Sequence, residues 1–135
     1  MGDHTVHLSR GATRWLGIWL DSTLSLAENG RRRIGRARQA EFKLWPIVNL
    51  YGVPPAAALN LQMAIVQRTM LYAPELTWSG GAGVGGEHQR AINRMGRSTL
   101  GAFRSTPQGI IAAESGLTPA RALLNRRQAR FTQRP

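Results

Sequence analysis

Cysteine is absent from this chain, and acidic residues are few among its 135 positions. Without cysteine there are no disulfide bonds and no cysteine-based zinc sites. The acids are Asp3, Asp21, Glu28, Glu41, Glu75, Glu87 and Glu114. No two are adjacent, and none belongs to a metal-binding pattern of the kind that two-metal phosphoryl chemistry requires. We therefore expect no metal site and no catalytic residues in this chain by itself, and interpret Asp21 as a turn or cap residue.

Long hydrophobic runs are also missing. No apolar stretch approaches the ~20 residues that span a bilayer, and the start "MGDHTVHLSRG" has no apolar core of a signal peptide. The length is that of one domain or part of one. We expect a soluble, intracellular protein with no membrane partner.

Histidine and serine offer little catalytic chemistry. His4 and His7 lie two residues apart in a strand-like stretch, and His88 stands alone at a predicted helix start. A metal site needs three or four convergent ligands, so we expect all three to be surface histidines. No serine lies in a nucleophile elbow. Nucleophilic catalysis has no candidate residue.

Arginine is what the chain has in excess. The formal net charge is +11, and 17 of the 18 basic residues are arginine, with Lys43 the single lysine. Such a balance indicates a polyanionic partner, with nucleic acid the leading candidate. The planar guanidinium also suits phosphate, because it donates two hydrogen bonds at once. A biased coding composition is the alternative explanation.

The hydrophobic pattern predicts a mainly α protein that begins with a short β-hairpin. Two strands, 5–9 and 13–21, are joined by the turn "RGA". The second strand carries Leu16, Ile18 and Leu20 on one face and Trp15, Gly17 and Trp19 on the other. Neither face is polar, and a lone hairpin is marginal in water. We therefore expect the edge of a larger sheet.

Four to five helices follow the hairpin. They are predicted at about 27–45, 55–73 and 87–103, with two more beginning at Pro107 and Pro119 behind hydroxyl caps. Ile34, Ala37, Leu44 and Val48 share the inward face of the first helix with Glu41, and Ile92, Met95 and Thr99 face inward in the third. The domain boundaries predicted are 1–25 (hairpin), 26–78 (two helices), 79–86 (glycine-rich linker) and 87–135.

The segment "GAGVGG" at 81–86 matches the GxGxxG pattern of dinucleotide-binding sites. That site requires a buried strand before the glycines and an acid about twenty residues later. Here a predicted helix precedes the glycines, and Glu114 lies too far along. We interpret the segment as a flexible linker.

The strongest functional signal is the segment "RRRIGRAR". Its candidate phosphate contacts are Arg31, Arg32, Arg33, Arg36, Arg38 and Lys43, and a second possible face carries Arg90, Arg94 and Arg97. If about five phosphates were neutralised, log affinity for a duplex would fall with log salt at a slope near −4 to −5. The alternatives are a solvated helix face and a nuclear localisation patch.

In order and spacing, these segments resemble the reverse transcriptases of non-LTR retrotransposons, particularly fungal LINE-like elements. "RWLGIWLDSTLS" is similar to the primer-grip hairpin at the end of the polymerase palm, and "GRRRIGRARQAE" to the first thumb helix. "LYGVPP", "QMAIVQRTMLYAPELTW" and the segment from His88 to Phe131 resemble the remaining thumb and the connection region ahead of the ribonuclease H domain.

The resemblance implies a role in gripping rather than catalysis. Trp15, Leu16, Gly17 and Trp19 would be the primer-grip-like residues, with Gly17 permitting close backbone approach. Leu16, Ile18 and Leu20 would pack on the first helix. The aspartates that hold Mg²⁺ in this family would lie before Met1, and ribonuclease H would follow the last helix. The implied partners are an RNA/DNA duplex and the remainder of the polymerase, in a nuclear ribonucleoprotein. "AENG" departs from the family pattern, so the start of the first thumb helix is expected to fray.

Other interpretations of the same residues stay open. The apolar side chains of the hairpin would all be core residues if the hairpin had no role at a primer. The whole chain could be a free-standing basic helical module that binds RNA or DNA without sequence specificity. It could also be a retroelement remnant with no selected activity.

Overall fold

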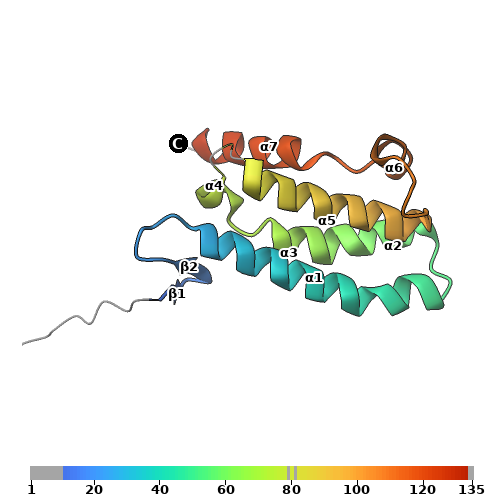
Figure 1. The fold of residues 1–135 in the computed structure, drawn as a ribbon, viewed down its shortest axis with the longest axis horizontal. Helices are drawn as coiled ribbons and strands as arrows, with labels where there is room; N and C mark the ends of the chain where they lie inside the picture. Colours follow the sequence, from blue (N-terminus) through green and yellow to red (C-terminus); the bar gives the residue numbers. More distant parts are fainter. Residues whose placement is uncertain (1–10, 79, 81, 134–135) are drawn as a thin grey trace, which may run out of the picture.

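The protein is described from a computed structural model, which covers residues 11–78, 80 and 82–133. Figure 1 shows a small β-hairpin beside the start of a bundle of helices. The elements are β1 (Thr13–Trp15), β2 (Ile18–Leu20), α1 (Ala27–Leu50), α2 (Pro55–Gln62), the π-helix η1 (Met63–Gln67), α3 (Arg68–Met70), α4 (Pro74–Thr77), α5 (Ala82–Leu100), α6 (Gln108–Ser115) and α7 (Ala120–Thr132). The prediction of a mainly helical chain behind an N-terminal hairpin is confirmed.

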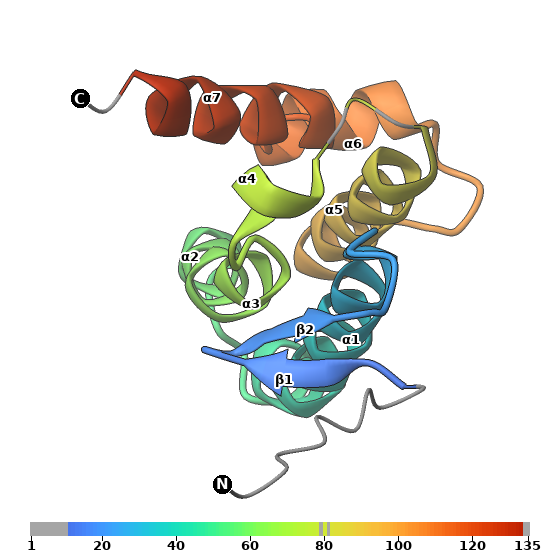
Figure 2. The same ribbon diagram turned by 90° about the vertical axis from the view of Figure 1, so that its left-hand side faces the viewer.

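The number of helices also agrees with the prediction. α2, η1 and α3 follow one another without a break, so the described residues form five helical segments of at least eight residues. The single turn α4 was not predicted. Figure 2 looks along the bundle and shows α7 lying over α4, with the hairpin beside α1.

The hairpin differs from the prediction in its position. β1 and β2 are antiparallel, with Thr13 opposite Leu20 and Trp15 opposite Ile18. The turn between them is Leu16–Gly17, whose φ angles are 46° and 82°. Positive φ at both central residues is the geometry of a tight two-residue hairpin turn. The predicted unbroken strand 13–21 is therefore wrong, and the predicted strand 5–9 lies outside the described residues.

Helix α1 runs five residues beyond its predicted end, through Pro46 to Leu50. Proline inside a helix removes one hydrogen bond and normally breaks or bends the helix. Val48 lies beyond the proline and is buried on the same face as Leu44. Burial of this side chain favours continuation of the helix past Pro46.

The core lies where α1, η1, α3, α5 and α7 meet. Its buried side chains are Ala37, Leu44, Val66, Met70, Leu71, Trp78, Ala91, Ile92, Met95, Leu117, Ala120 and Leu124. The inward positions predicted for the first and third helices are all buried, except that Glu41 is only partly covered. Helical periodicity thus identified the packed faces correctly.

The glycine-rich segment is not a linker over most of its length. Helix α5 begins at Ala82, so the glycines up to position 86 lie inside its first turns, five residues before the predicted start. A Cβ on Gly85 would lie 2.9 Å from the Trp78 ring, which indicates why a residue without a side chain is found there. Residues 79 and 81 lie outside the described part of the chain.

The two C-terminal helices begin close to their predicted positions. Pro107 and Pro119 are their N-caps, with φ angles of −57° and −56°, and neither helix has a side-chain cap hydrogen bond. The predicted hydroxyl caps are therefore wrong. The fixed φ of proline sets the direction of each helix instead. Gly116 ends α6 in the left-handed conformation.

Candidate nucleic-acid interface

The arginines predicted to bind phosphate do not form one surface. The structure places them in four environments: against the hairpin, between α1 and α5, in a pocket between α1 and α3, and against the loop before α6. Arg31 and Lys43 remain exposed on α1. Each environment leaves a different amount of positive charge available to a ligand.

Two arginines hold the hairpin against α1. The guanidinium of Arg32 lies 3.8 Å from the centre of the Trp19 ring, and its Nε donates to Glu28 Oε1 at 2.6 Å. Arg33 donates to the carbonyl oxygen of Gly17. The Trp19 amide donates to the side chain of Asn29 at 3.2 Å, and Asn29 is buried. These contacts give the two arginines a structural role.

The predicted packing of the hairpin is only partly correct. Leu16 was expected to pack on the first helix but is 73% exposed, whereas Trp19 is the residue stacked by α1. Trp15 is also largely exposed. A Cβ on Gly17 would lie 3.2 Å from the Tyr72 hydroxyl oxygen, so this glycine does allow a close approach, in this structure by a side chain.

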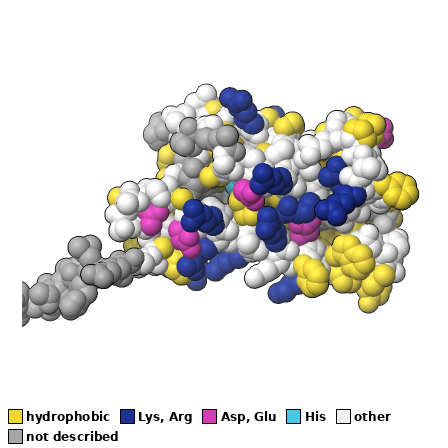
Figure 3. Space-filling model, in the orientation of Figure 1, with side chains coloured by type: hydrophobic (Ala, Val, Ile, Leu, Met, Phe, Trp, Pro, Cys, Tyr) yellow, Lys and Arg dark blue, Asp and Glu magenta, His cyan; other side chains and the backbone are white. Residues whose placement is uncertain are grey.

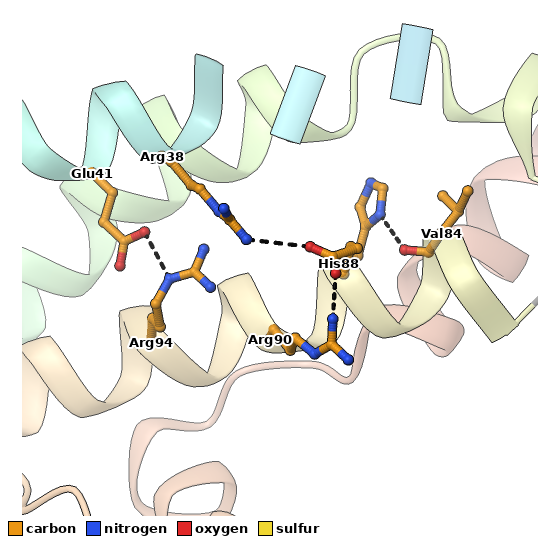
Figure 4. Close-up of polar contacts among 7 residues, drawn as sticks. Arg38, Glu41, Val84, His88, Arg90 and Arg94 are labelled. Carbon is orange, nitrogen blue, oxygen red and sulfur yellow. Dashed lines mark hydrogen bonds and ion pairs between the residues drawn. The ribbon is translucent and has the colours of Figure 1, made fainter. Parts of the chain in front are cut away.

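Ion pairs reduce the positive charge between α1 and α5 (Figure 4). Arg38 Nη2 lies 3.3 Å from Glu87 Oε2, and Arg90 pairs with the same carboxylate. Arg94 Nε lies 3.2 Å from Glu41 Oε2. Three arginines thus share two carboxylates, which leaves this face weakly basic.

Arg97, the third member of the predicted second face, has a different role. Its Nη2 donates to the Thr106 carbonyl oxygen at 2.9 Å. This hydrogen bond ties the end of α5 to the loop before α6. Arg97 is therefore oriented toward the backbone of its own chain, away from a common binding surface with Arg90 and Arg94.

A pocket between α1 and the η1–α3 segment concentrates unpaired positive charge. This basic pocket has a volume of about 530 Å³ and is lined by Arg33, Arg36, Ala64, Ile65, Arg68, Thr69 and Tyr72. None of these described lining residues is acidic. Neither Arg36 nor Arg68 forms an ion pair with a carboxylate in the described part of the chain.

The electrostatics of Arg33 reflect this crowding. Burial, followed by the charges of Arg36 and Arg14, lowers the pKa of the Arg33 guanidinium below its ordinary value. Its Nε is buried and has no hydrogen-bond partner. A buried donor without a partner is costly, and like charges held together repel. An anion in the basic pocket would reduce this repulsion between the arginines.

Sequence reasoning identified Arg33 and Arg36 but missed Arg68, Arg14 and Tyr72. Arg68 is the only charged residue between positions 55 and 73, and an isolated charge in an apolar helix was the one available signal. Its approach to α1 depends on how the helices pack. Tyr72 reads as an apolar position in the sequence, yet its ring lies under Arg33 and its hydroxyl donates to the Leu16 carbonyl oxygen at 3.4 Å.

The other predicted sites have mixed outcomes. His88 is buried, with Nδ1 2.7 Å from the Val84 carbonyl oxygen, so its assignment to the surface is wrong. His4 and His7 lie outside the described residues. Asp21 is a turn residue as predicted, because its carboxylate accepts hydrogen bonds from Thr23 and Ser25. Within 11–78, 80 and 82–133, no three metal-ligating side chains gather in one place.

In comparisons with known proteins, no family model, curated protein or solved structure matches the chain. None of the helices in the described ranges is long and apolar enough to cross a membrane.

Proposed function

We propose that the chain binds the phosphate backbone of a nucleic acid through the basic pocket. The observation that carries this proposal is the convergence of Arg33, Arg36 and Arg68 on a pocket with no acidic lining. Guanidinium groups recognise phosphate by paired hydrogen bonds. The hydroxyls of Thr69 and Tyr72 also line the pocket, but each donates within the chain, to the carbonyl oxygens of Ile65 and Leu16.

The number of available arginines limits the strength of binding. The three arginines of the pocket, with Arg14 nearby, would neutralise about three to four phosphates, which gives a salt slope of about −3 to −4 on duplex DNA. This is weaker than the slope expected from the sequence, because Arg32, Arg38 and Arg94 have partners within the chain. Because the proposed contacts are to phosphates, which carry no sequence information, we expect no sequence specificity.

We further propose that this module is the thumb and connection region of a non-LTR retrotransposon reverse transcriptase. The support is the resemblance in segment order, together with the docking of the hairpin beside the basic pocket through Arg33 and Tyr72. In such a polymerase the hairpin would lie near the primer end and the pocket would hold the duplex behind it. Mg²⁺ and its aspartates would belong to the rest of the enzyme.

A free-standing binding module would use the same pocket. The two proposals differ in what precedes Met1 in the gene. An in-frame palm sequence with paired aspartates upstream would support the polymerase proposal, and its absence from intact genomic copies would leave the free-standing module.

Binding by the basic pocket is tested with Arg36→Gln and Arg68→Gln. Both side chains are exposed and have no ion pair among the described residues, so their loss should not disturb the fold. Arg33 is left intact because it also holds the hairpin. The matched control is Arg121→Gln, an exposed arginine on α7.

The measurement is fluorescence anisotropy with a labelled DNA duplex and an RNA/DNA hybrid, across a salt series. Each pocket variant should weaken binding to both duplexes and reduce the salt slope by about 1. Arg121→Gln should change neither. A salt response that is flat, or equal for all three variants, would reject the proposal.

A further inference from the structure

A second pocket lies on a different face of α1, toward α5. This aromatic pocket has a volume of about 490 Å³ and is lined by Arg38, Glu41, Phe42, Trp45 and Arg94. It shares no residue with the basic pocket. Figure 3 shows hydrophobic side chains gathered over the C-terminal half of α1, next to basic ones.

The two aromatic rings of this pocket are exposed. Phe42 is 81% exposed and Trp45 is 53% exposed. They are three residues apart on α1, so their side chains are neighbours on the helix surface. Neither ring contributes to the core cluster. Their positions are therefore not explained by the folding of the described residues.

The polar lining of the pocket is only partly paired within the chain. Arg94 Nη2 is buried without a hydrogen-bond partner, although its Nε is bound by Glu41. Arg38 shares Glu87 with Arg90, so its charge is only partly neutralised. The pocket thus combines flat apolar surface, a hydrogen-bond acceptor on Glu41 and donors on two arginines.

We propose that the aromatic pocket binds an unpaired nucleotide of a single-stranded nucleic acid. A base would stack on the rings of Phe42 and Trp45, and its phosphate would accept hydrogen bonds from Arg38 and Arg94. Stacking on aromatic side chains beside arginines is a general mode of single-strand binding. The inference rests on the proposed function, because the ligand is the same polymer, but it depends on separate residues.

Base stacking in the aromatic pocket differs from phosphate binding in the basic pocket in how much it depends on charge. The arginines of the aromatic pocket already share carboxylates, so most of the affinity should come from the base. The pocket should therefore distinguish a strand with bases from one without them, and its loss should leave the salt slope unchanged. The basic pocket should show the opposite behaviour.

The test compares two labelled probes, an oligodeoxythymidylate of about ten nucleotides and an abasic strand of equal length. The protein should bind the thymidylate more tightly. Phe42→Ala and Trp45→Ala should each weaken thymidylate binding about five- to a hundredfold, leaving abasic binding unchanged. Trp45→Phe should largely restore it, and the control Phe103→Ala, which removes an equally exposed ring from the loop before α6, should have no effect.

Each outcome has a distinct meaning. Equal binding of the two probes, or a preference that survives both alanine variants, overturns the proposal. Alanine variants that alter only self-association, measured by sedimentation, would also overturn it and assign the rings to a protein interface. If instead the proposed backbone binding by the basic pocket is wrong, Arg36→Gln and Arg68→Gln will leave binding of the abasic strand unchanged. The preference for the thymidylate will then persist.

Discussion

The guanidinium of Arg33 lies over the ring of Tyr72, with its central carbon 4.0 Å from the ring centre. The same arginine donates to the carbonyl oxygen of Gly17, and the Tyr72 hydroxyl donates to that of Leu16. One pair of side chains therefore holds the hairpin turn and forms one wall of the basic pocket. Two short strands are too little to be stable in water, so this contact positions the hairpin.

Tyr72→Leu should loosen the hairpin without unfolding the bundle. The variant keeps apolar volume but loses the cation–π contact and the hydroxyl donor, at a cost of about 1 kcal/mol. Hydrogen exchange should show faster exchange of the Trp19 amide, which donates to Asn29. Tyr51→Leu is the control, since Tyr51 is 77% exposed, and it should leave this amide unchanged. Equal protection in both variants would contradict the proposed role of Tyr72.

Helical periodicity was sufficient to predict the buried faces of α1 and α5, because one stripe of each helix must be apolar. It was not sufficient for the hairpin, since Leu–Gly is a weak turn signal compared with Asn–Gly. The predicted start of α5 was also wrong. The glycines there favour a loop by propensity, but the Trp78 ring packs against Gly85. Tertiary packing decided that boundary.

The candidate site was only half predictable for a similar reason. The sequence shows where arginines are, but their ion pairs depend on which helices become neighbours. Glu87 lies 49 residues from Arg38, and Glu41 lies 53 residues from Arg94. No local pattern links such pairs. The same limit hid Arg68, which joins Arg33 and Arg36 only after α1 packs against the η1–α3 segment.

Gly96 and Gly86 should respond oppositely to alanine. A Cβ on Gly96 would lie 2.7 Å from Ile111 Cγ2, so Gly96→Ala should reduce the free energy of unfolding by about 1–3 kcal/mol. A Cβ on Gly86 has no atom within 4 Å among those described, and Gly86→Ala should raise stability by about 0.5–1 kcal/mol through higher helix propensity. Urea denaturation measures both, and a stabilising Gly96→Ala would refute the close α5–α6 packing.

Leu16→Asn should stabilise the hairpin turn. Leu16 has a φ of 46°, which is unfavourable for leucine, and its side chain is 73% exposed. Burial of the side chain therefore does little to offset the backbone strain. Asparagine tolerates this conformation, and the gain should be about 1 kcal/mol in the free energy of unfolding. Leu50→Asn is the control for removing an exposed leucine at the end of α1. A gain of equal size in both variants would mean that it comes from removing an exposed apolar side chain and not from the turn.

The turn after β2 should weaken in acid because of Asp21. Its carboxylate accepts hydrogen bonds from the hydroxyl and amide of Ser25 and from the amide and hydroxyl of Thr23. The Ser25 hydroxyl bond is the largest cause of a pKa lowered from the ordinary 3.8. Since the folded pKa lies below the unfolded one, the stabilisation is fully present above about 3.8. It is lost as the pH falls through the folded value.

Asp21→Asn provides the measurement of this effect. The neutral amide cannot titrate, so the free energy of unfolding of the natural chain should exceed that of the variant at neutral pH, and the difference should shrink toward about pH 2. Glu114→Gln is the control, because Glu114 is exposed on α6 and has no hydrogen bond or ion pair with the described residues. A difference for Asp21→Asn that stays constant across this range would mean that its charge does not stabilise the turn. The hairpin would then be held to α1 by Arg32, Arg33 and Asn29. The turn that connects β2 to α1 would not contribute.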